Sequence, residues 1–116
     1  MKKFRSHHVG VDQGDIQLFS DFENGGDMWT GTGPRQRRRA VVFSAPFRDP
    51  PAVTVSVSLW DVDTQNAMRA EITAEDVTCD GFDVVFRTWG DTRVARLRVA
   101  WQAVGELPDP DEWELY

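Results

Sequence analysis

The sequence predicts an all-β fold, a six-stranded antiparallel β-sandwich, on three observations. Apolar residues in the middle of the chain recur with a period of two, the repeat of a strand that buries one face. Turn-forming residues separate these runs at short intervals, as they do in small sandwiches. No segment carries apolar residues at the 3.6-residue spacing of a long amphipathic helix. The 116 residues are enough for one such domain.

Six runs of residues are the expected strands. In the clearest, residues 52–59, Val53, Val55, Val57 and Leu59 alternate with small, mostly polar side chains, so we expect these four to face the core. The Asp80-Gly81 pair is typical of a tight hairpin turn and separates two of the other runs. Those five other strands are expected at residues 15–19, 35–43, 68–75, 82–87 and 95–102.

Charge and composition divide the chain into an N-terminal arm (1–13), a sandwich domain (14–104) and an acidic, Pro-containing tail (105–116). The net charge is −6, from 19 acidic and 13 basic residues, and five of the acids lie in the last eleven residues. The rest of the chain is therefore almost neutral. A body with no broad basic face is not expected to bind nucleic acid by neutralising phosphates.

The sequence gives no sign of a membrane segment. No apolar run approaches the ~20 residues that cross a bilayer, and the basic start of the chain is not followed by the apolar stretch of a secretory signal. We therefore expect that the protein is made in the cytoplasm and does not insert into a membrane. Release by lysis and incorporation into a virion are both compatible with this expectation.

The sequence contains few residues suited to binding a metal or to enzyme catalysis. Cys79 is the only cysteine, which excludes an internal disulfide and a zinc site built on several thiolates. Residues 61–66 are rich in oxygen ligands but lack the central Gly and closing Glu of a calcium loop. Familiar motifs for nucleophilic, phosphate-binding or zinc-dependent enzymes are absent. We expect no cofactor, no metal and no enzyme; a glycosidase-like carboxylate pair of Asp61 with Asp91 is the remaining enzymatic alternative.

Carbohydrate recognition has better candidates. A sugar presents hydroxyl pairs, which Arg and Asp bind well, and a patch of C–H bonds, which packs on an aromatic ring. Arg69 follows a predicted turn, and Trp89, Gly90 and Asp91 end a predicted strand, so the three types of side chain meet if these strand ends are adjacent. The alternatives are core packing for Trp89 and a surface ion pair for Arg69.

Arginines also gather on the outward sides of the expected strands, together with Val85 and Ala100. This pattern has two interpretations. It is a solvated charged face, or it is an oligomer interface in which arginines meet the acids of a neighbour. The arginines on these strands are Arg35, Arg37, Arg38, Arg39, Arg69, Arg87, Arg96 and Arg98.

Residues 35–104 resemble the H-type lectin domain family, which includes a snail agglutinin and the C-terminal domains of slime-mould discoidins. The resemblance depends on an ordered set of motifs at fixed spacing rather than on any one of them. They are Val42-Phe43-Ser44-Ala45-Pro46-Phe47, Pro50-Pro51, Leu59-Trp60-Asp61-Val62, Asn66-Ala67-Met68-Arg69, Gly81-Phe82, Thr88-Trp89-Gly90-Asp91-Thr92 and Val99-Ala100-Trp101.

The resemblance implies a parallel homotrimer, sugar bound at the boundary between two protomers without metal, and Arg-rich sheet faces packed around the three-fold axis. The family's sugar-binding Arg and Trp fall on Arg69 and Trp89. Gly90 stands where the snail protein has His, and the loop that carries a sugar-binding Asp there lacks it here. Asp27, Arg35 and Asp91 are the candidates to replace that carboxylate contact.

The function that follows is a lectin module, a homotrimer that binds cell-surface glycan in adhesion. Its expected ligand is a galactose- or N-acetylgalactosamine-like glycan or a bacterial surface polysaccharide. The alternative is a trimeric spike or fibre component of a phage-like particle that mediates host attachment. In that case the arm and the tail, with Trp113 and Tyr116, would bind other particle or fibre proteins.

Overall fold

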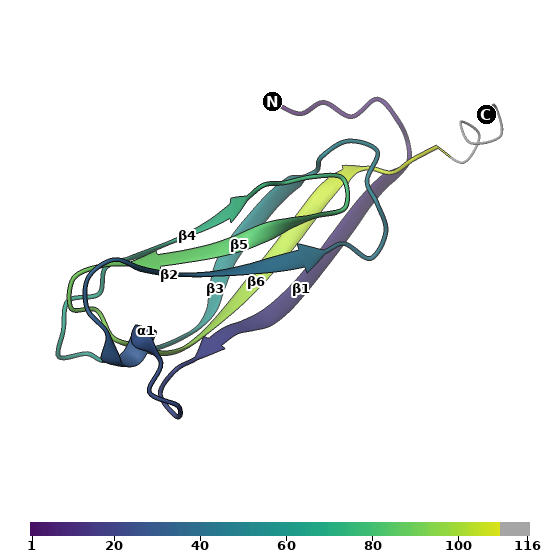
Figure 1. The fold of residues 1–116 in the computed structure, drawn as a ribbon. Coiled ribbons are helices and arrows are strands. Elements are labelled where there is room, and N and C mark those ends of the chain that lie inside the picture. Colours follow the sequence, from purple (N-terminus) through teal and green to yellow (C-terminus); the bar gives the residue numbers. More distant parts are fainter. Residues whose placement is uncertain (110–116) are drawn as a thin grey trace.

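The computed structural model describes residues 1–109; the part of the acidic tail with Trp113 and Tyr116 lies outside them. Two three-stranded antiparallel sheets face each other, one in the order β1-β6-β3 and the other β2-β5-β4 (Figure 1). The predicted all-β sandwich of six strands is confirmed. The elements are β1 (Val9–Ser20), the one-turn helix α1 (Asp27–Thr30), β2 (Arg35–Val42), β3 (Ala52–Val62), β4 (Ala70–Glu75), β5 (Gly81–Thr88) and β6 (Val94–Glu106).

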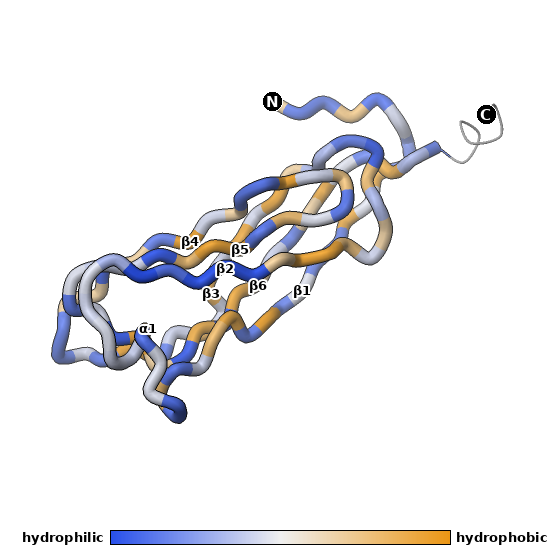
Figure 2. Tube along the Cα trace, in the orientation of Figure 1, coloured by the Kyte–Doolittle hydropathy of each residue, from blue (hydrophilic) through white to orange (hydrophobic). Residues whose placement is uncertain are grey.

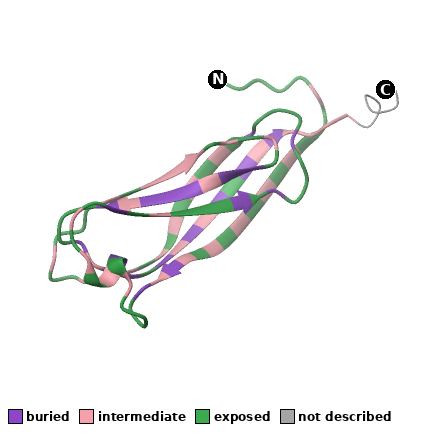
Figure 3. Ribbon diagram, in the orientation of Figure 1, coloured by how far each residue is buried: buried purple, intermediate pink, exposed green. Residues whose placement is uncertain are grey.

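The core lies between the sheets and depends most on the two central strands, β5 and β6. Phe86 and Leu97 are fully buried there, and β5 is buried along nearly its whole length (Figure 3). The period-two pattern explains this, because alternate residues of each strand point to the same face. The first half of β2 is instead a hydrophilic run of arginines (Figure 2).

Strand β1 is longer than expected. It begins at Val9, which pairs with Glu106, so residues 9–13 of the expected arm belong to the sheet. Gly10 and Gly14 both lie within this strand, and their missing side chains make room for neighbours. A Cβ at Gly10 would lie 2.7 Å from Leu107, and one at Gly14 would lie 2.7 Å from the Trp101 indole. These glycines therefore allow close packing within a strand.

A β-bulge changes the end of β3. The pairing with β6 shifts between Val57 and Leu59, so that Leu59 lies opposite Arg98 and Trp60 lies opposite Leu97. Trp60 then packs edge-on against the core residue Phe86, with 6.0 Å between ring centres. The prediction that Leu59 continues the core face of Val53, Val55 and Val57 is wrong beyond the bulge, because one inserted residue exchanges the two faces.

The connections gather at the two ends of the sandwich. We call the end that carries α1, the β3–β4 loop and the β5–β6 loop the loop end; the N-terminus lies at the opposite end (Figure 1). There the arm, residues 1–8, contacts its own chain. The backbone N–H groups of Arg5 and Ser6 donate to the Glu106 carboxylate, and Lys2 donates to the Pro50 carbonyl at 2.7 Å. Across residues 1–109, no helix combines the length and the apolar character needed to cross a membrane.

Candidate functional site

Side-chain hydroxyls fasten the β3–β4 loop to the β5–β6 loop. The Arg69 backbone N–H donates to the Thr92 hydroxyl at 2.9 Å, and that hydroxyl donates to the Ala67 carbonyl at 2.8 Å. The Thr88 hydroxyl donates to the Arg69 carbonyl. Thr88 and Thr92 are themselves buried, at 2% and 1% exposure. The structure thus brings the segment of Arg69 against residues 89–91 within one chain.

Gly90 is the centre of this arrangement. Its φ of +69° is in the left-handed region, which glycine adopts without strain. The Arg69 side chain passes beside it, with Cδ 3.6 Å from the place of a Cβ. The Gly90 carbonyl accepts the Gly33 N–H at 2.8 Å and an Arg35 N–H at 3.3 Å. Gly90 therefore joins the β5–β6 loop to the segment that precedes β2.

Within residues 1–109, Arg69 and Asp91 have no partners for their charges. Both are exposed, and neither side chain makes a hydrogen bond or ion pair with the described residues. Several other arginines are paired with acids of the same chain at 2.6–3.3 Å: Arg37, Arg38, Arg87, Arg93, Arg96 and Arg98. The alternative of a surface ion pair for Arg69 does not hold within the described chain, and its guanidinium is open to a ligand.

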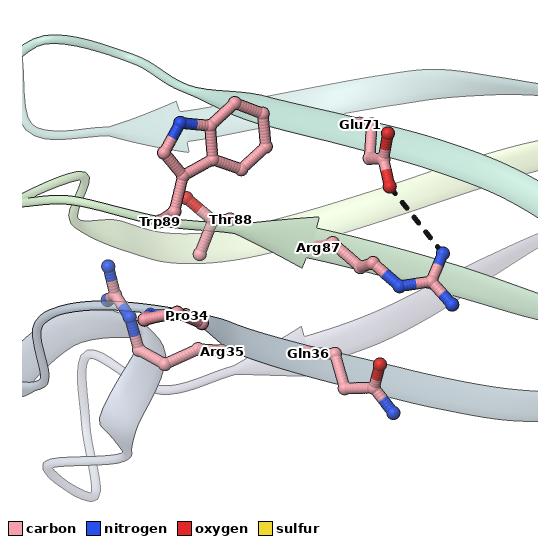
Figure 4. Close-up of a pocket in the computed structure, with 7 residues that line it drawn as sticks. All are labelled: Pro34, Arg35, Gln36, Glu71, Arg87, Thr88 and Trp89. Atoms are coloured by element: carbon pink, nitrogen blue, oxygen red, sulfur yellow. Dashed lines mark ion pairs between the residues drawn. The ribbon is translucent and has the colours of Figure 1, made fainter.

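Trp89 is also available, since 42% of its surface is exposed and it is not a core residue. It forms one wall of an open groove of about 420 Å³, where the loop end meets the outer face of the β2-β5-β4 sheet (Figure 4). The groove was not predicted from the sequence, because its residues come from three strands. They are Pro34, Arg35, Gln36, Glu71, Arg87, Thr88 and Trp89.

Arg35 differs from the expectation that it binds sugar hydroxyls. It is only 8% exposed, and it donates to the carbonyls of Gly33 (2.9 Å), Asp27 (3.1 Å), Met28 (3.4 Å) and Gly90 (3.3 Å). These contacts use most of the five donors of a guanidinium. Arg35 therefore holds α1 and the β5–β6 loop together, and Arg69 offers the free guanidinium.

Asp27 lies at the same end but already has a partner. Its carboxylate accepts from Arg37 at 2.6 Å, and this hydrogen bond, with the charge of Arg37, lowers the pKa of Asp27. Arg37 also binds the buried Asp21 at 2.7 Å, and Asp21 accepts the Met28 N–H at 3.0 Å. Asp27 and Arg37 thus stabilise the α1 segment, while Asp91 is the carboxylate with free acceptors.

The outer face of the β2-β5-β4 sheet is a network of ion pairs over an apolar floor. Arg38 contacts Glu75, Asp76 and Asp83, and Arg87 binds Glu75 with 2.6 and 3.2 Å contacts. The Arg87 hydrogen bond is the main cause that lowers the pKa of Glu75 to about 2. Val85 is fully buried on this face. These acids belong to the same chain, which corrects the interpretation that the arginines here are balanced by acids of a neighbour.

Residues 1–109 contain no group of three or more His, Cys, Asp or Glu side chains placed to hold a metal ion. Asp61, the other member of the suggested carboxylate pair, accepts from Arg96 at 3.0 Å across the β3–β6 pairing. Among the described residues, the loop end offers groups suited to binding: an unpaired guanidinium, an unpaired carboxylate and an exposed indole on adjoining loops.

Comparisons with known proteins agree with this description. The family model for the H-type lectin domain matches residues 38–104. Discoidin-2 of Dictyostelium discoideum is 38% identical over 76 residues, which span 65% of this chain and 30% of that protein. A protein of Fuscovulum blasticum described as ATP synthase subunits region ORF 7 is 53% identical over 107 residues, 92% of this chain and 93% of its own length. The solved structure of recombinant discoidin II of Dictyostelium discoideum superimposes with a TM-score of 0.75 at 28% identity, over 93% of this chain and 41% of that one.

Proposed function

We propose, from the fact that this chain belongs to the H-type lectin domain family, that it binds a carbohydrate at the loop end of its sandwich. The observation that carries the proposal is the exposed Arg69 guanidinium, which has no partner among the described residues and lies beside Gly90, the residue that follows Trp89 and precedes Asp91 in the chain. An unpaired charge beside an exposed indole fits a ligand with both hydroxyl groups and an apolar face.

Each of these side chains has a distinct role in the proposed complex. Arg69 donates two hydrogen bonds to neighbouring sugar hydroxyls, and Asp91 accepts from a hydroxyl on the other side. Trp89 packs against the C–H face of the pyranose ring. Gly90 leaves open the space between them, since it has no side chain and its φ is +69°. The proposed sugar is galactose- or N-acetylgalactosamine-like, or a unit of a bacterial surface polysaccharide.

We also propose that three copies assemble, as the family resemblance implies. Single sites built from a few exposed side chains are weak. Three of them on one assembly gain through multivalency by factors of ~10²–10⁴ when the glycans are dense. This gain suits adhesion to a glycan-coated surface. Sedimentation of the purified protein tests the assembly, and a mass three times that of one chain supports it.

The direct test is calorimetric titration with a glycan selected on an array, comparing wild type with Arg69→Ala. We expect the variant to lose at least about tenfold in affinity, since a hydrogen bond to a charged group contributes ~1.5–3 kcal/mol. Its thermal stability should not change, because the guanidinium has no partner to lose in the part of the chain that the structure describes. Arg96→Ala, which removes an exposed arginine on the other sheet, is the matched control. Equal affinities of Arg69→Ala and wild type would remove Arg69 from the site, and no binding to any glycan contradicts the lectin function.

A further inference from the structure

We propose that Asn24 is a site of spontaneous covalent modification, at which the side-chain amide is lost through a cyclic imide and replaced by aspartate or isoaspartate. Asn24 and Gly25 lie in the connection between β1 and α1, which projects beyond the strands at the loop end (Figure 1). Both residues are exposed. The only co-reactant is water, so the reaction needs neither a glycan nor an assembly.

The nucleophile in this reaction is the backbone nitrogen of Gly25. Its N–H makes no hydrogen bond with the described residues 1–109. Gly25 has a φ of +68°, in the left-handed region that glycine adopts without strain. Apart from its chain neighbours, no atom lies within 4 Å of the place of a Cβ. Neither a side chain nor a distant part of the chain therefore hinders the approach of this nitrogen to the Asn24 amide.

The electrophile is the side-chain carbon Cγ of Asn24. Its oxygen, Oδ1, accepts the Gly26 N–H at 3.2 Å. A donor in this position stabilises the negative charge that develops on the oxygen when a nucleophile attacks the carbon. The amino group, Nδ2, makes no hydrogen bond within the described part of the chain. The turn thus activates the carbonyl and leaves the departing group unbound.

The bonds balance without oxidation or reduction. Gly25 N gives its proton to hydroxide and bonds to Cγ of Asn24, the Cγ–Nδ2 bond breaks, and Nδ2 takes a proton from water and leaves as ammonia. Water then opens the five-membered imide at one of its two carbonyls. Cleavage at Cγ gives aspartate, and cleavage at the main-chain carbonyl gives isoaspartate, whose backbone runs through Cγ. One ammonia leaves and one water enters.

Two other places in the chain have similar residues but lack this geometry. Asn66, the only other asparagine, is followed by a residue with a side chain, and its amide donates to Asp63 at 3.3 Å. Asp80 precedes a glycine, but the Gly81 N–H donates to the Thr78 hydroxyl at 3.2 Å, and Gly81 is buried. An unbound glycine nitrogen beside an activated amide is therefore a feature of the connection before α1.

The modification changes the turn that leads into α1. Gly26 closes this turn, since its N–H donates to the Asp21 carbonyl at 3.0 Å and its carbonyl accepts the N–H groups of Trp29 and Thr30 at 3.0 Å. Isoaspartate in place of Asn24 adds one carbon to the backbone just before these contacts. The α1 amides should then open more readily and lose protection from hydrogen exchange.

The test follows the ageing of the purified full chain in mildly alkaline buffer by mass spectrometry of tryptic peptides. Residues 6–35 form the peptide with Asn24, and residues 49–69 form the peptide with Asn66, the internal control. We expect Asn24 to gain one mass unit at least ~10-fold faster than Asn66, because the donor to Oδ1 and the missing side chain of Gly25 each lower the barrier. Asn24→Gln, whose longer side chain would have to close a six-membered ring, should block the change.

Three results would overturn the modification site. The first is equal rates at the two asparagines. The second is a rate at Asn24 that does not rise when mildly acidic buffer is replaced by mildly alkaline buffer, since the imide route needs the deprotonated Gly25 nitrogen. The third is a product that contains aspartate but no isoaspartate on fragmentation.

The effect on α1 is measured by hydrogen exchange on the isoaspartate form, separated from the aged protein by chromatography. Asn24→Asp is the matched control, since it adds the same charge without lengthening the backbone. We expect the Trp29 and Thr30 amides to exchange several-fold faster in the isoaspartate form than in Asn24→Asp. Equal exchange in the two would overturn the effect on α1 while leaving the modification site standing.

Discussion

The guanidinium of Arg35, in β2, donates a hydrogen bond to the carbonyl oxygen of Gly90, in the β5–β6 loop, at 3.3 Å. The same guanidinium reaches Gly33 and two carbonyls of α1, so one buried side chain joins three segments of the loop end. The Arg69 guanidinium, only a few ångströms from Gly90, makes no such contacts with the described residues 1–109. One arginine therefore organises the site and the other is left free to bind.

Arg35→Met should destabilise the fold. The change leaves the carbonyls of Gly33, Asp27 and Gly90 without their donor in a buried setting, which costs about 2–4 kcal/mol. Urea unfolding followed by circular dichroism measures it. Arg39→Met is the matched control, because Arg39 is an exposed arginine of the same strand with one bond to the Gln17 carbonyl; it should cost under ~1 kcal/mol. Equal losses in the two variants would contradict the organising role of Arg35.

Trp89→Ala should lower glycan affinity, whereas Trp60→Ala should lower stability. The two indoles are similarly exposed, at 42% and 48%, but Trp60 packs on the core residue Phe86 and Trp89 does not belong to the core. We expect Trp60→Ala to lose about 1–2 kcal/mol of unfolding free energy and to keep glycan affinity. Trp89→Ala should keep stability and lose more than tenfold in affinity. Thermal melts and titrations on both variants check this, and a common effect on both properties would oppose it.

Glu75 should make stability depend on pH in the acid range. Its hydrogen bond with Arg87 lowers its pKa from 4.5 to about 2. A carboxyl with a depressed pKa in the folded state stabilises that state above about pH 4.5, and this contribution is lost as the pH falls toward 2. The difference in melting temperature between wild type and Glu75→Gln should therefore be largest near neutral pH and shrink below pH ~4. A difference in melting temperature that stays constant down to pH ~2 would contradict the role of ionised Glu75 in stability.

Glu106 should hold the N-terminal arm on the sheet. Its carboxylate accepts the backbone N–H groups of Arg5 and Ser6, and these bonds lower the pKa of Glu106. Trypsin cleavage after Lys2, Lys3 or Arg5 should be several-fold faster in Glu106→Ala than in wild type, since the local opening that protease needs becomes easier. Mass spectrometry of timed digests gives the rates. Glu23→Ala, in an exposed loop at the other end, is the control and should be cleaved at the wild-type rate. A wild-type cleavage rate in Glu106→Ala would show that Glu106 does not hold the arm on the sheet.

Local pattern was sufficient for most of the fold. The alternation in residues 52–57, 82–87 and 95–102 predicts the strands and their buried faces, because apolar residues at every second position indicate a strand with one face on the core. Local pattern failed where the structure of a segment depends on residues far away in the sequence. Gly10 and Gly14 weaken any strand pattern in residues 9–14, and the neighbours that need this space, Leu107 and Trp101, lie far away in the sequence. The bulge before Leu59 likewise depends on the pairing with β6.

The site was predictable in its components and not in their roles. Trp89, Asp91 and Arg69 were identified from the residue types at strand ends, and the structure places their segments together. Arg35 and Arg69 are alike in sequence, and only the carbonyls around Arg35 distinguish them. The groove beside Trp89 depends on the strand register of three segments far apart in the chain, which no local pattern contains.

A nuclear magnetic resonance titration tests the central claim most directly. The ¹⁵N-labelled protein is titrated with the glycan that binds most tightly on an array, and shifts are followed for backbone amides and tryptophan indoles. Binding at the loop end predicts shifts at the Trp89 indole and the amides of Gly90 and Asp91, with Arg5 and Glu106 at the opposite end unchanged. Shifts confined to the opposite end, or an unmoved Trp89 indole at saturation, would contradict carbohydrate binding at this site.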